Sequence, residues 1–224
     1  MAVIAIDGPS SSGKSTVAKL VAKKINFFYL DTGAMYRAVT LSYIRGNYNL
    51  ENDKDVDRLL NDSKISVSKN SGEILLNGQS VEPLIRNGEV TDKVSYVCAF
   101  LKIRQAMTKL QREIGKNVSI VMDGRDIGTT VFPDAKLKIF LTADIKERAR
   151  RRQKDFAEKG INFDIERVTR DLSERDYKDS NRSVSPLKKA EDAVCIDTTD
   201  MSIEEVCNKI IELSKDREIL TPGE

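Results

Sequence analysis

Residues 2–24, AVIAIDGPSSSGKSTVAKLVAKK, decide the fold class of this chain. The segment 2–7 is a short apolar run that stops at a glycine, which is typical of a buried parallel strand. Apolar residues recur with helical spacing over 14–24, and this pattern predicts a helix. Between the two, Gly8–Thr16 (GPSSSGKST) matches the pattern G-x-x-x-x-G-K-[S/T]. A strand, a glycine-rich turn and a helix in this order predict a phosphate-binding loop, or P-loop.

Each part of this loop has a physical task. The glycines let the backbone curl so that main-chain N–H groups face a phosphate, and the start of the following helix adds about half a positive charge. Lys14 is predicted to reach the β- and γ-phosphates of a nucleotide, and the Ser15 hydroxyl to ligate Mg²⁺. The predicted phosphate-binding residues are Gly8, Pro9, Ser10, Ser11, Ser12, Gly13, Lys14, Ser15 and Thr16.

The composition is that of an ordinary globular protein. The 224 residues are 40% hydrophobic and 32% charged, which suits one α/β domain with room for insertions. The net charge is +2 with acids and bases interspersed, so we expect neither nucleic acid nor membrane as a partner. The start, MAVIAIDG, lacks a basic leader, and no window approaches the ~20 apolar residues of a membrane span, so we expect a cytoplasmic location.

Two residue types restrict the chemistry. The chain has no histidine, which excludes Ser-His-Asp triads and histidine general bases. Its three cysteines are far apart and form no CxxC, which predicts reduced thiols rather than a disulfide framework or a zinc site. The remaining groups are lysine, arginine, aspartate, serine, threonine and a bound metal. They suit phosphoryl transfer, in which catalysis is mainly positioning and electrostatics.

Strands and helices alternate along most of the chain. Strands are predicted at 2–7, 27–31, 119–123, 136–141 and 193–197, and helices at 14–24, 33–46, 99–115, 145–159, 164–178 and 202–216. This alternation predicts an α/β fold with a doubly wound five-stranded parallel sheet and helices on both faces. Between 64 and 81, two alternating runs and an Asn77-Gly78 turn predict a small antiparallel hairpin in an inserted subdomain. Ser202 and Glu205 have the spacing of a capping box.

Charged residues follow the third predicted strand. Asp123 ends the apolar run 119–122, where a Walker-B-type acid and an ordinary turn aspartate would both fit. Arg125 and Asp126 come next, between two glycines, at the sheet edge where ligands bind in such folds. An exposed ion pair alone would contribute little and would not need this place.

A second group of charges occupies 174–187, ERDYKDSNRSVSPL. Arg175, Asp179 and Arg182 are spaced by four and then three residues, which puts them on one face of a helix. One interpretation is a solvated face held together by local ion pairs. The other is a face that binds a ligand.

Four motifs together resemble the bacterial cytidylate kinases, a family of P-loop nucleoside monophosphate kinases. They are DGPSSSGKST (7–16), LDTGAMYR (30–37), MDGRDIGTTVFPDA (122–135) and ERDYKDSNRSVSPL (174–187). The resemblance covers nearly the whole chain. It implies Mg²⁺-dependent phosphorylation of CMP and dCMP to CDP and dCDP with ATP as donor. It also implies one kinase domain, expected as a monomer, made of a core (1–33, 100–144, 184–224), a monophosphate-binding insert with the hairpin (34–99) and a helical lid (145–183).

The resemblance also implies residue roles. The catalytic residues would be Lys14, Asp123, Arg125 and Arg182, and the metal ligands Ser15 and Asp123. The acceptor would be bound by Thr32, Arg37, Ser95, Arg104, Arg125, Asp126, Arg175, Asp179 and Arg182. Arg37 and Arg125 would grip its phosphate, and Asp126 and Arg104 would read the cytosine edge, helped by Thr32 and Ser95. The Arg175, Asp179 and Arg182 face would meet its sugar and phosphate, because arginines suit phosphate oxygens and an aspartate suits sugar hydroxyls.

Two positions depart from the family pattern. Thr32 stands where a serine is common, so the hydroxyl is kept and the shape changes. Ser11 and Ser12 replace a commoner Gly-Ala pair, which leaves the glycines and the lysine of the loop intact.

The helix predicted over 145–159 carries four arginines, Arg148, Arg150, Arg151 and Arg152. Pairs of opposite charge four residues apart favour a self-supporting surface helix. A lid that supplies arginine to the transferring phosphoryl group is the functional interpretation, and the two can hold for different arginines.

Two other functions stay open. Another P-loop kinase for a small acceptor, such as a different nucleoside monophosphate or a shikimate-like metabolite, would share the loop. A nucleotide-binding module without fast catalysis is less favoured, because the NKxD motif of guanine-binding switches is absent from the sequence.

Overall fold

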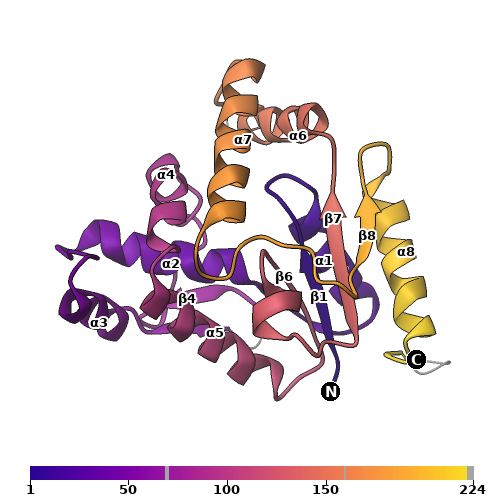
Figure 1. The fold of residues 1–224 in the computed structure, drawn as a ribbon, viewed down its shortest axis with the longest axis horizontal. Helices are drawn as coiled ribbons and strands as arrows, with labels where there is room; N and C mark the ends of the chain where they lie inside the picture. The colour runs from indigo at the N-terminus through magenta and orange to yellow at the C-terminus, as the bar shows by residue number, and fades with distance from the viewer. Residues whose placement is uncertain (69–70, 159, 221–224) are drawn as a thin grey trace. The chain divides into compact units, whose positions relative to one another are not determined.

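A computed structural model describes residues 1–68, 71–158 and 160–220 of the chain. The described chain divides into two compact units (Figure 1). The first unit comprises Met1–Tyr29 and Val118–Glu224, and the second comprises Leu30–Asn117.

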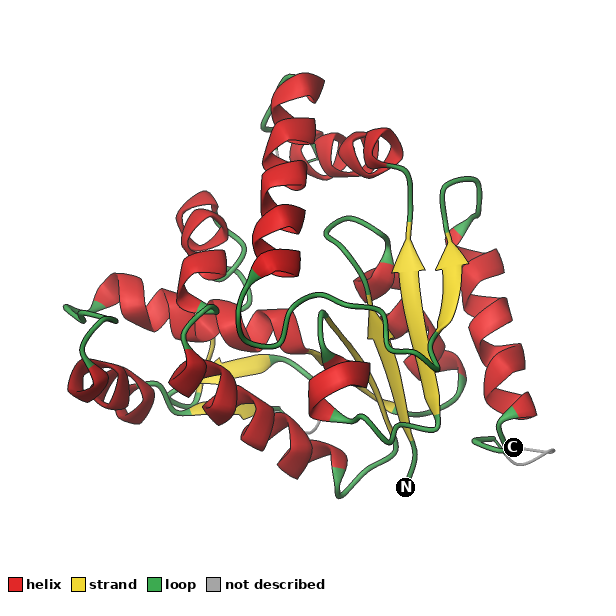
Figure 2. Cartoon of the chain, viewed as in Figure 1, coloured by secondary structure: helices red, strands yellow, loops and turns green. Residues whose placement is uncertain are grey.

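The first unit is built on the large sheet. Its strands are β1 (Val3–Asp7), β2 (Phe28–Asp31), β6 (Ile120–Gly124), β7 (Leu137–Thr142) and β8 (Val194–Asp197), in the order β2-β6-β1-β7-β8. The chain passes into the second unit within β2. Because β1 pairs in parallel with both β6 and β7, it is an inner strand, and its carboxyl end lies between those of two neighbouring strands. The predicted five-stranded parallel sheet is confirmed, and Figure 2 shows its strands flanked by helices.

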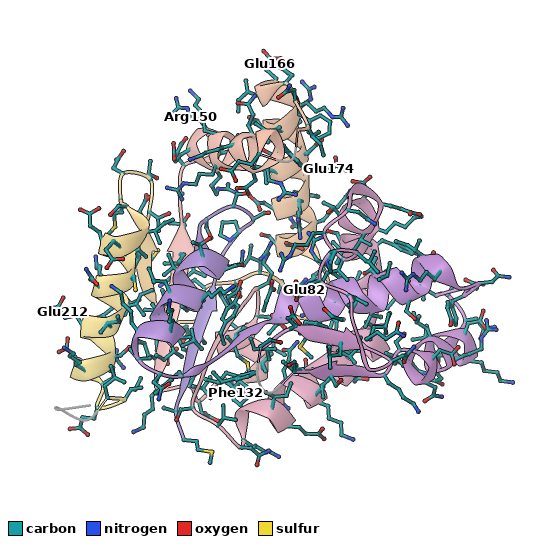
Figure 3. The ribbon with its side chains drawn as sticks, turned by 180° about the vertical axis from the view of Figure 1, so that it is seen from behind. Glu82, Phe132, Arg150, Glu166, Glu174 and Glu212 are labelled. Atoms are coloured by element: carbon teal, nitrogen blue, oxygen red, sulfur yellow. The ribbon has the colours of Figure 1, made fainter. Side chains whose placement is uncertain are left out.

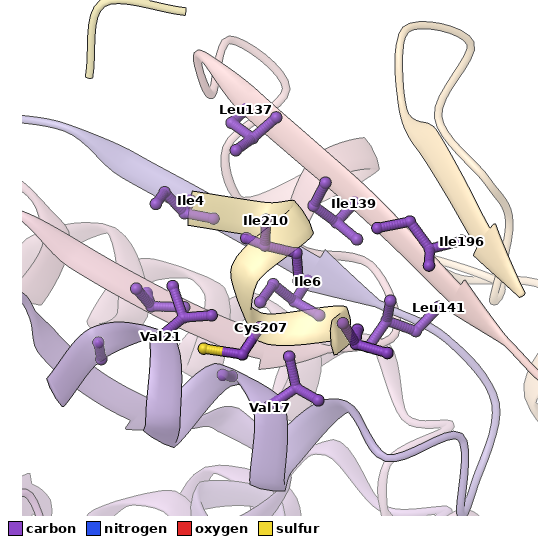
Figure 4. Packing of buried hydrophobic residues seen from close by; sticks show 14 residues of the cluster. Ile4, Ile6, Val17, Val21, Leu137, Ile139, Leu141, Ile196, Cys207 and Ile210 are labelled. Atoms are coloured by element: carbon purple, nitrogen blue, oxygen red, sulfur yellow. The ribbon is translucent and has the colours of Figure 1, made fainter. Parts of the chain in front are cut away.

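Two helices cover one face of this sheet. They are α1 (Lys14–Lys24), whose bounds match the prediction, and α8 (Ile203–Asp216), which begins one residue later than predicted. Figure 4 shows their apolar side chains meeting those of β1, β7 and β8, with Cys207 in the cluster. Burial of each large aliphatic side chain contributes about 1.5–3 kcal/mol, so this layer holds the start of α1 firmly under the sheet edge. The predicted capping box of Ser202 and Glu205 is present at the start of α8.

Helices α6 (Ile145–Ala157) and α7 (Ile165–Asn181) follow β7. Figure 1 shows them packed together beyond the carboxyl end of β7. Ala149, Val168 and Leu172 form their small core, and Asp144 and Asp164 cap their first turns. Helix α7 ends three residues later than predicted. Lys159, at the end of the other predicted helix, lies outside the described residues.

The second unit is mainly helical. It contains α2 (Thr32–Arg45), α3 (Asp53–Asp62), α4 (Gly88–Val97) and α5 (Leu101–Gly115), with β3 (Ile65–Val67), β4 (Ile74–Leu76) and β5 (Gln79–Ser80). The three strands form an antiparallel sheet, so the predicted antiparallel patch is confirmed with one more strand. Asn77 and Gly78 have φ values of 52° and 80°, which the two-residue turn between β4 and β5 requires. Lys69 and Asn70 lie outside the described residues.

Three helical elements were not expected from the sequence. These are α3, α4 and a short π-helix, η1 (Ile127–Val131), which packs against β1 and β6 directly after the Arg125-Asp126 pair. Cys98 and Cys207 are buried, Cys195 is exposed, and all three are free thiols. In the described part of the chain, we find no helix with the length and apolar character that crossing a membrane requires.

Candidate active site

The loop between β1 and α1 is curled by backbone conformations that favour glycine. A Cβ on Gly8 would stand 2.1 Å from the carbonyl oxygen of Leu141, so a larger residue cannot fit there. Gly13 and Ser11 have φ values of 88° and 59°, in the left-handed region. Lys14 is buried at the start of α1, and its Nζ donates to the carbonyl oxygen of Pro9 over 3.2 Å. The loop therefore has the tight geometry of a phosphate cradle.

The two serines inside the loop have physical consequences. A non-glycine residue in the left-handed region costs roughly 1–2 kcal/mol, which explains why glycine suits the position of Ser11. Ser12 is fully buried, and its Oγ has no hydrogen-bond partner among the described residues. A buried hydroxyl without a partner is unfavourable. A bound anion would accept a hydrogen bond from the Ser12 hydroxyl, so this group fits a phosphate-binding loop.

Ser15 and Asp123, the predicted metal ligands, are in contact. Ser15 Oγ donates to Asp123 Oδ2 over 2.6 Å, and the Tyr29 hydroxyl donates to Asp123 Oδ1 over 2.8 Å. Register places Asp123 opposite Ile6, one residue before β1 ends. No group of three or more acidic or cysteine side chains among the described residues forms a metal site by itself. The two hard oxygens fit Mg²⁺, which usually keeps several waters and phosphate oxygens as ligands.

Arg148 connects α6 to the loop. Its Nη1 donates to the Ser10 carbonyl oxygen over 3.2 Å and to Asp176 Oδ2 over 2.5 Å, while its Nε donates to the Ala143 carbonyl oxygen over 3.0 Å. Asp176 Oδ1 in turn accepts from the Ser10 N–H over 3.4 Å. One residue of α6 and one of α7 therefore meet at the same loop residue.

Arg151 lies on the same side of α6. Its Nη1 donates to Thr198 Oγ1 over 2.9 Å, and Thr198 Oγ1 donates to the Ser12 carbonyl oxygen over 3.1 Å. Arg151 also makes an ion pair with Glu147, four residues earlier on the helix, over 3.1 Å. Arg150 has 71% of its side chain exposed and points outward in Figure 3. The helix is thus both a self-supporting surface helix and a source of arginines that reach the loop.

The second predicted charged face is buried rather than solvated. Arg125 Nε donates to Asp179 Oδ2 over 2.9 Å, and Arg182 Nη1 lies 3.8 Å from Asp179 Oδ1. Arg182 Nη2 also lies 3.9 Å from Asp126 Oδ1. The spacing had suggested that Arg182 belongs to the helix, but α7 ends at Asn181. Arg182 follows the last helical residue in an extended conformation and still faces Asp179.

The pKa values of this cluster reflect its arginines. Burial acts to raise the pKa of Asp179, but Arg125, Arg175 and Arg182 together hold it below its ordinary value. Burial acts to lower the pKa of Arg125, and Asp179 reverses this so that the pKa lies above its ordinary value. Both groups are therefore ionised at neutral pH, as an anion-binding arginine and its counter-charge must be.

The remaining predicted acceptor residues belong to the second unit. Arg37 Nη1 donates to the Ile85 carbonyl oxygen over 3.1 Å and to Thr91 Oγ1 over 3.0 Å. Thr32 is the buried first residue of α2, and Ser95 is half-buried on α4.

Arg104 has an unusual position for an arginine. It is only 2% exposed on α5, its Nη1 donates to the Cys98 carbonyl oxygen over 3.3 Å, and its guanidinium lies 5.0 Å from the centre of the Tyr36 ring. Stacking on an aromatic ring keeps the guanidinium plane fixed. A preorganised donor of this kind suits the recognition of a planar ligand edge.

Sequence reasoning missed several residues around the loop. They are Asp7, Tyr29, Arg148 in its specific role, Asp176 and Thr198. Asp7 ends β1 and Asp123 lies one residue before the end of β6, and this shared position near the end of a strand was a usable signal. The others contact the loop or Asp123 through pairings over long sequence separations, and nothing local marks them.

A sheet with a phosphate loop after its first strand, and an acid on the neighbouring strand that faces the loop serine, defines a P-loop nucleotide-binding fold. The chain belongs to the cytidylate kinase family, whose sequence model matches residues 4–216. A cytidylate kinase from Ligilactobacillus salivarius is 49% identical over 216 residues, covering 96% of this chain and 96% of the relative. Another from Thermosipho melanesiensis is 50% identical over 214 residues, covering 96% of this chain and 97% of the relative.

The fold also resembles that of a solved structure of an uncharacterised protein from Eubacterium ventriosum. The TM-score is 0.54 at 13% sequence identity, over 96% of this chain and 99% of the other. At this identity the likeness concerns the fold alone.

Proposed function

We propose that the protein transfers the γ-phosphoryl group of ATP, with Mg²⁺, to CMP and dCMP, giving CDP and dCDP for pyrimidine nucleotide metabolism. Membership of the cytidylate kinase family supports the reaction class. The observation that carries the proposal is the register of β1 and β6, in which Asp7 faces Gly124. Because of this register, the P-loop and the Arg125-Asp126 segment begin side by side at one edge of the sheet.

On the donor side, the P-loop main chain and Lys14 would bind the ATP phosphates. Ser15 and Asp123 would hold Mg²⁺, which neutralises charge on the phosphates and orients them. Lys14 is already fixed by the loop, so little reorganisation is needed as negative charge redistributes in the transition state. Arg148 and Arg151 would complete the donor side from α6.

On the acceptor side, Arg37 and Arg125 are proposed to bind the acceptor phosphate. Arg175 and Arg182 would add positive charge near it. Asp179 would offset the repulsion between these arginines and accept from a sugar hydroxyl. None of these steps needs a histidine base, because phosphoryl transfer depends mainly on alignment and charge stabilisation.

Base selection is proposed to rest on a fixed carboxylate and a fixed guanidinium. Asp126 would accept from the N4 amine of cytosine, where uracil carries an oxygen that only accepts. Arg104 would donate to N3 or O2 of cytosine, and Thr32 and Ser95 would add hydroxyl contacts.

We also propose the division into a core (1–33, 100–144, 184–224), an insert (34–99) and a lid (145–183), acting as a cytoplasmic monomer. The hydrogen bond of Arg148 to the Ser10 carbonyl oxygen supports a lid role for α6. Arg151 adds an indirect link, because its partner Thr198 donates to the Ser12 carbonyl oxygen. Light scattering at enzyme concentrations used for assays would test the monomer.

The test of the proposed function is an ADP-release assay with ATP and a panel of acceptors, namely CMP, dCMP, UMP, AMP, GMP and shikimate. CMP and dCMP are expected to support turnover far better than the others. Preference for another nucleotide or for shikimate would instead favour a different small-acceptor kinase.

A further inference from the structure

Asp7, the last residue of β1, holds the segment that follows β6. Its side chain is buried, with 5% of the residue exposed. Asp7 Oδ1 accepts from the Ile127 N–H over 2.9 Å, and Asp7 Oδ2 accepts from the Gly128 N–H over 2.8 Å. Both acceptor atoms of one carboxylate are thus used on two successive main-chain donors that are 120 and 121 residues away in sequence.

These two donors are the first N–H groups of η1, which immediately follows Arg125 and Asp126. The first N–H groups of a helix have no partner within the helix, so they need an external acceptor. A serine or threonine would satisfy one of them, whereas a carboxylate satisfies both at once. Two bonds from one rigid strand end fix the direction as well as the position of the segment.

Asp7 therefore joins two functional segments. It is covalently followed by Gly8 and the P-loop, and it is hydrogen-bonded to the end of the Arg125-Asp126 segment. Burying a carboxylate is costly unless hydrogen bonds compensate for lost solvation, and here both partners are uncharged amides. Arg125 is the charged group of opposite sign near Asp7, and Asp126 is a nearby group of like sign. A buried carboxyl group is a costly choice where a serine or threonine cap would serve simple folding.

We propose that Asp7 is a positioning residue for acceptor selection: by holding the Ile127 and Gly128 amides, it keeps Asp126 in the place from which the acceptor base is read. This inference rests on the proposed function. Loss of Asp7 leaves the P-loop lysine and serine in the chain but frees the segment that carries Asp126. Loss of Asp7 should therefore reduce discrimination between CMP and UMP more than it reduces the rate of phosphoryl transfer.

The experiment compares Asp7→Asn with Asp197→Asn as a matched control. Asn keeps the size of Asp7 but presents an NH₂ group to one of the two N–H donors, so one bond is replaced by donor–donor repulsion. Asp197 also ends a strand of the same sheet, and its carboxylate accepts from the Thr199 N–H and hydroxyl over 2.9 and 2.6 Å. For each protein, kcat/KM is measured with CMP and with UMP, and KM is measured for ATP.

Asp7→Asn is expected to lower the ratio of kcat/KM for CMP to kcat/KM for UMP by about tenfold or more. The KM for CMP is expected to change more than the KM for ATP. Asp197→Asn is expected to keep the wild-type ratio. The ratio is taken on one preparation, so it does not depend on the fraction of protein that is folded. Asp7→Ser, which keeps one acceptor, gives a second variant if Asp7→Asn does not fold, and it should narrow the ratio as well.

Equal proportional losses with CMP and UMP in the Asp7 variants would overturn the inference and leave Asp7 a purely structural residue. Wild-type protein that does not phosphorylate CMP would instead overturn the proposed function. The two failures are therefore distinguishable in the same set of assays.

Discussion

At the scale of single residues, Lys14 is the charge on which phosphoryl transfer depends most. Its Nζ is held by the Pro9 carbonyl oxygen at the start of α1. Lys14→Ala removes this charge while leaving the loop backbone in place, so kcat is expected to fall by about 10²-fold or more. Steady-state kinetics with ATP and CMP measures the effect.

Lys19 is the matched control for this substitution, because it is an exposed lysine on the same helix. Lys19→Ala is expected to keep the wild-type kcat. Turnover close to wild type in Lys14→Ala would remove the P-loop from the mechanism.

Asp126 carries the prediction on base choice. The residue is buried beside Arg182, with 3.9 Å between Asp126 Oδ1 and Arg182 Nη2. A buried group left without its partner costs ~1–3 kcal/mol, and a charged group costs more. Asp126→Ala is therefore expected to lower kcat/KM for CMP by about 10-fold to 100-fold and to lower that for UMP much less. If Asp126 only supports its arginine neighbours, kcat/KM will fall by the same factor for CMP and for UMP.

The raised pKa of Asp7 predicts that the stability of the folded protein depends on pH. Burial raises the pKa of Asp7 to about 7, although the Gly128 and Ile127 amides and Arg125 pull it down. A carboxyl group with a raised pKa favours the folded state at low pH, and this contribution is lost as pH rises through about 7. From pH 5 to pH 8, wild-type protein should lose stability relative to Asp7→Asn, by at most roughly 3 kcal/mol.

Urea unfolding of both proteins at several pH values measures this difference. A stability difference that stays constant from pH 5 to pH 8 would mean that Asp7 keeps an ordinary pKa in the folded protein.

At the scale of elements, α6 carries a prediction that separates its arginines. Arg148 donates to the loop at Ser10 and to Asp176, whereas Arg150 is exposed and pairs with Glu147 over 3.5 Å. A hydrogen bond involving a charged group contributes about 1.5–3 kcal/mol. Arg148→Ala is therefore expected to lower kcat/KM for ATP about tenfold or more, and Arg150→Ala to leave it unchanged. Equal behaviour of the two variants would make α6 a surface helix only.

The elements that could be predicted are those in which the pattern of apolar residues along the chain favours the same structure as packing in the folded protein. Helix α1 and the large-sheet strands have clear apolar periodicity and glycine boundaries. Helix α3 was missed because its polar sequence buries little more than Val56 and Leu59. Helix α4 was missed because valine and threonine favour strands, and packing in the second unit overrides that preference. The caps from Asn52 and Asn87 were the available signals.

At the scale of the whole molecule, sequence motifs identified the groups that carry charge but not how they are held. The loop, Asp123 and the Arg125-Asp126 pair could be found because each follows a recognisable strand. The bonds of Asp7 to η1, and of Thr198 to Ser12 and Arg151, join segments that are distant in the chain. Such pairings are set by strand order and register, which periodicity alone does not determine.

The central claim is that the γ-phosphoryl group of ATP moves to CMP. The direct measurement follows the phosphorus of ATP labelled at the γ position, with CMP and Mg²⁺ present and UMP in a parallel reaction. The account predicts label in CDP, formed in equal amount with ADP, and far less label in UDP. Label released only as inorganic phosphate, or UDP formed as fast as CDP, would contradict it.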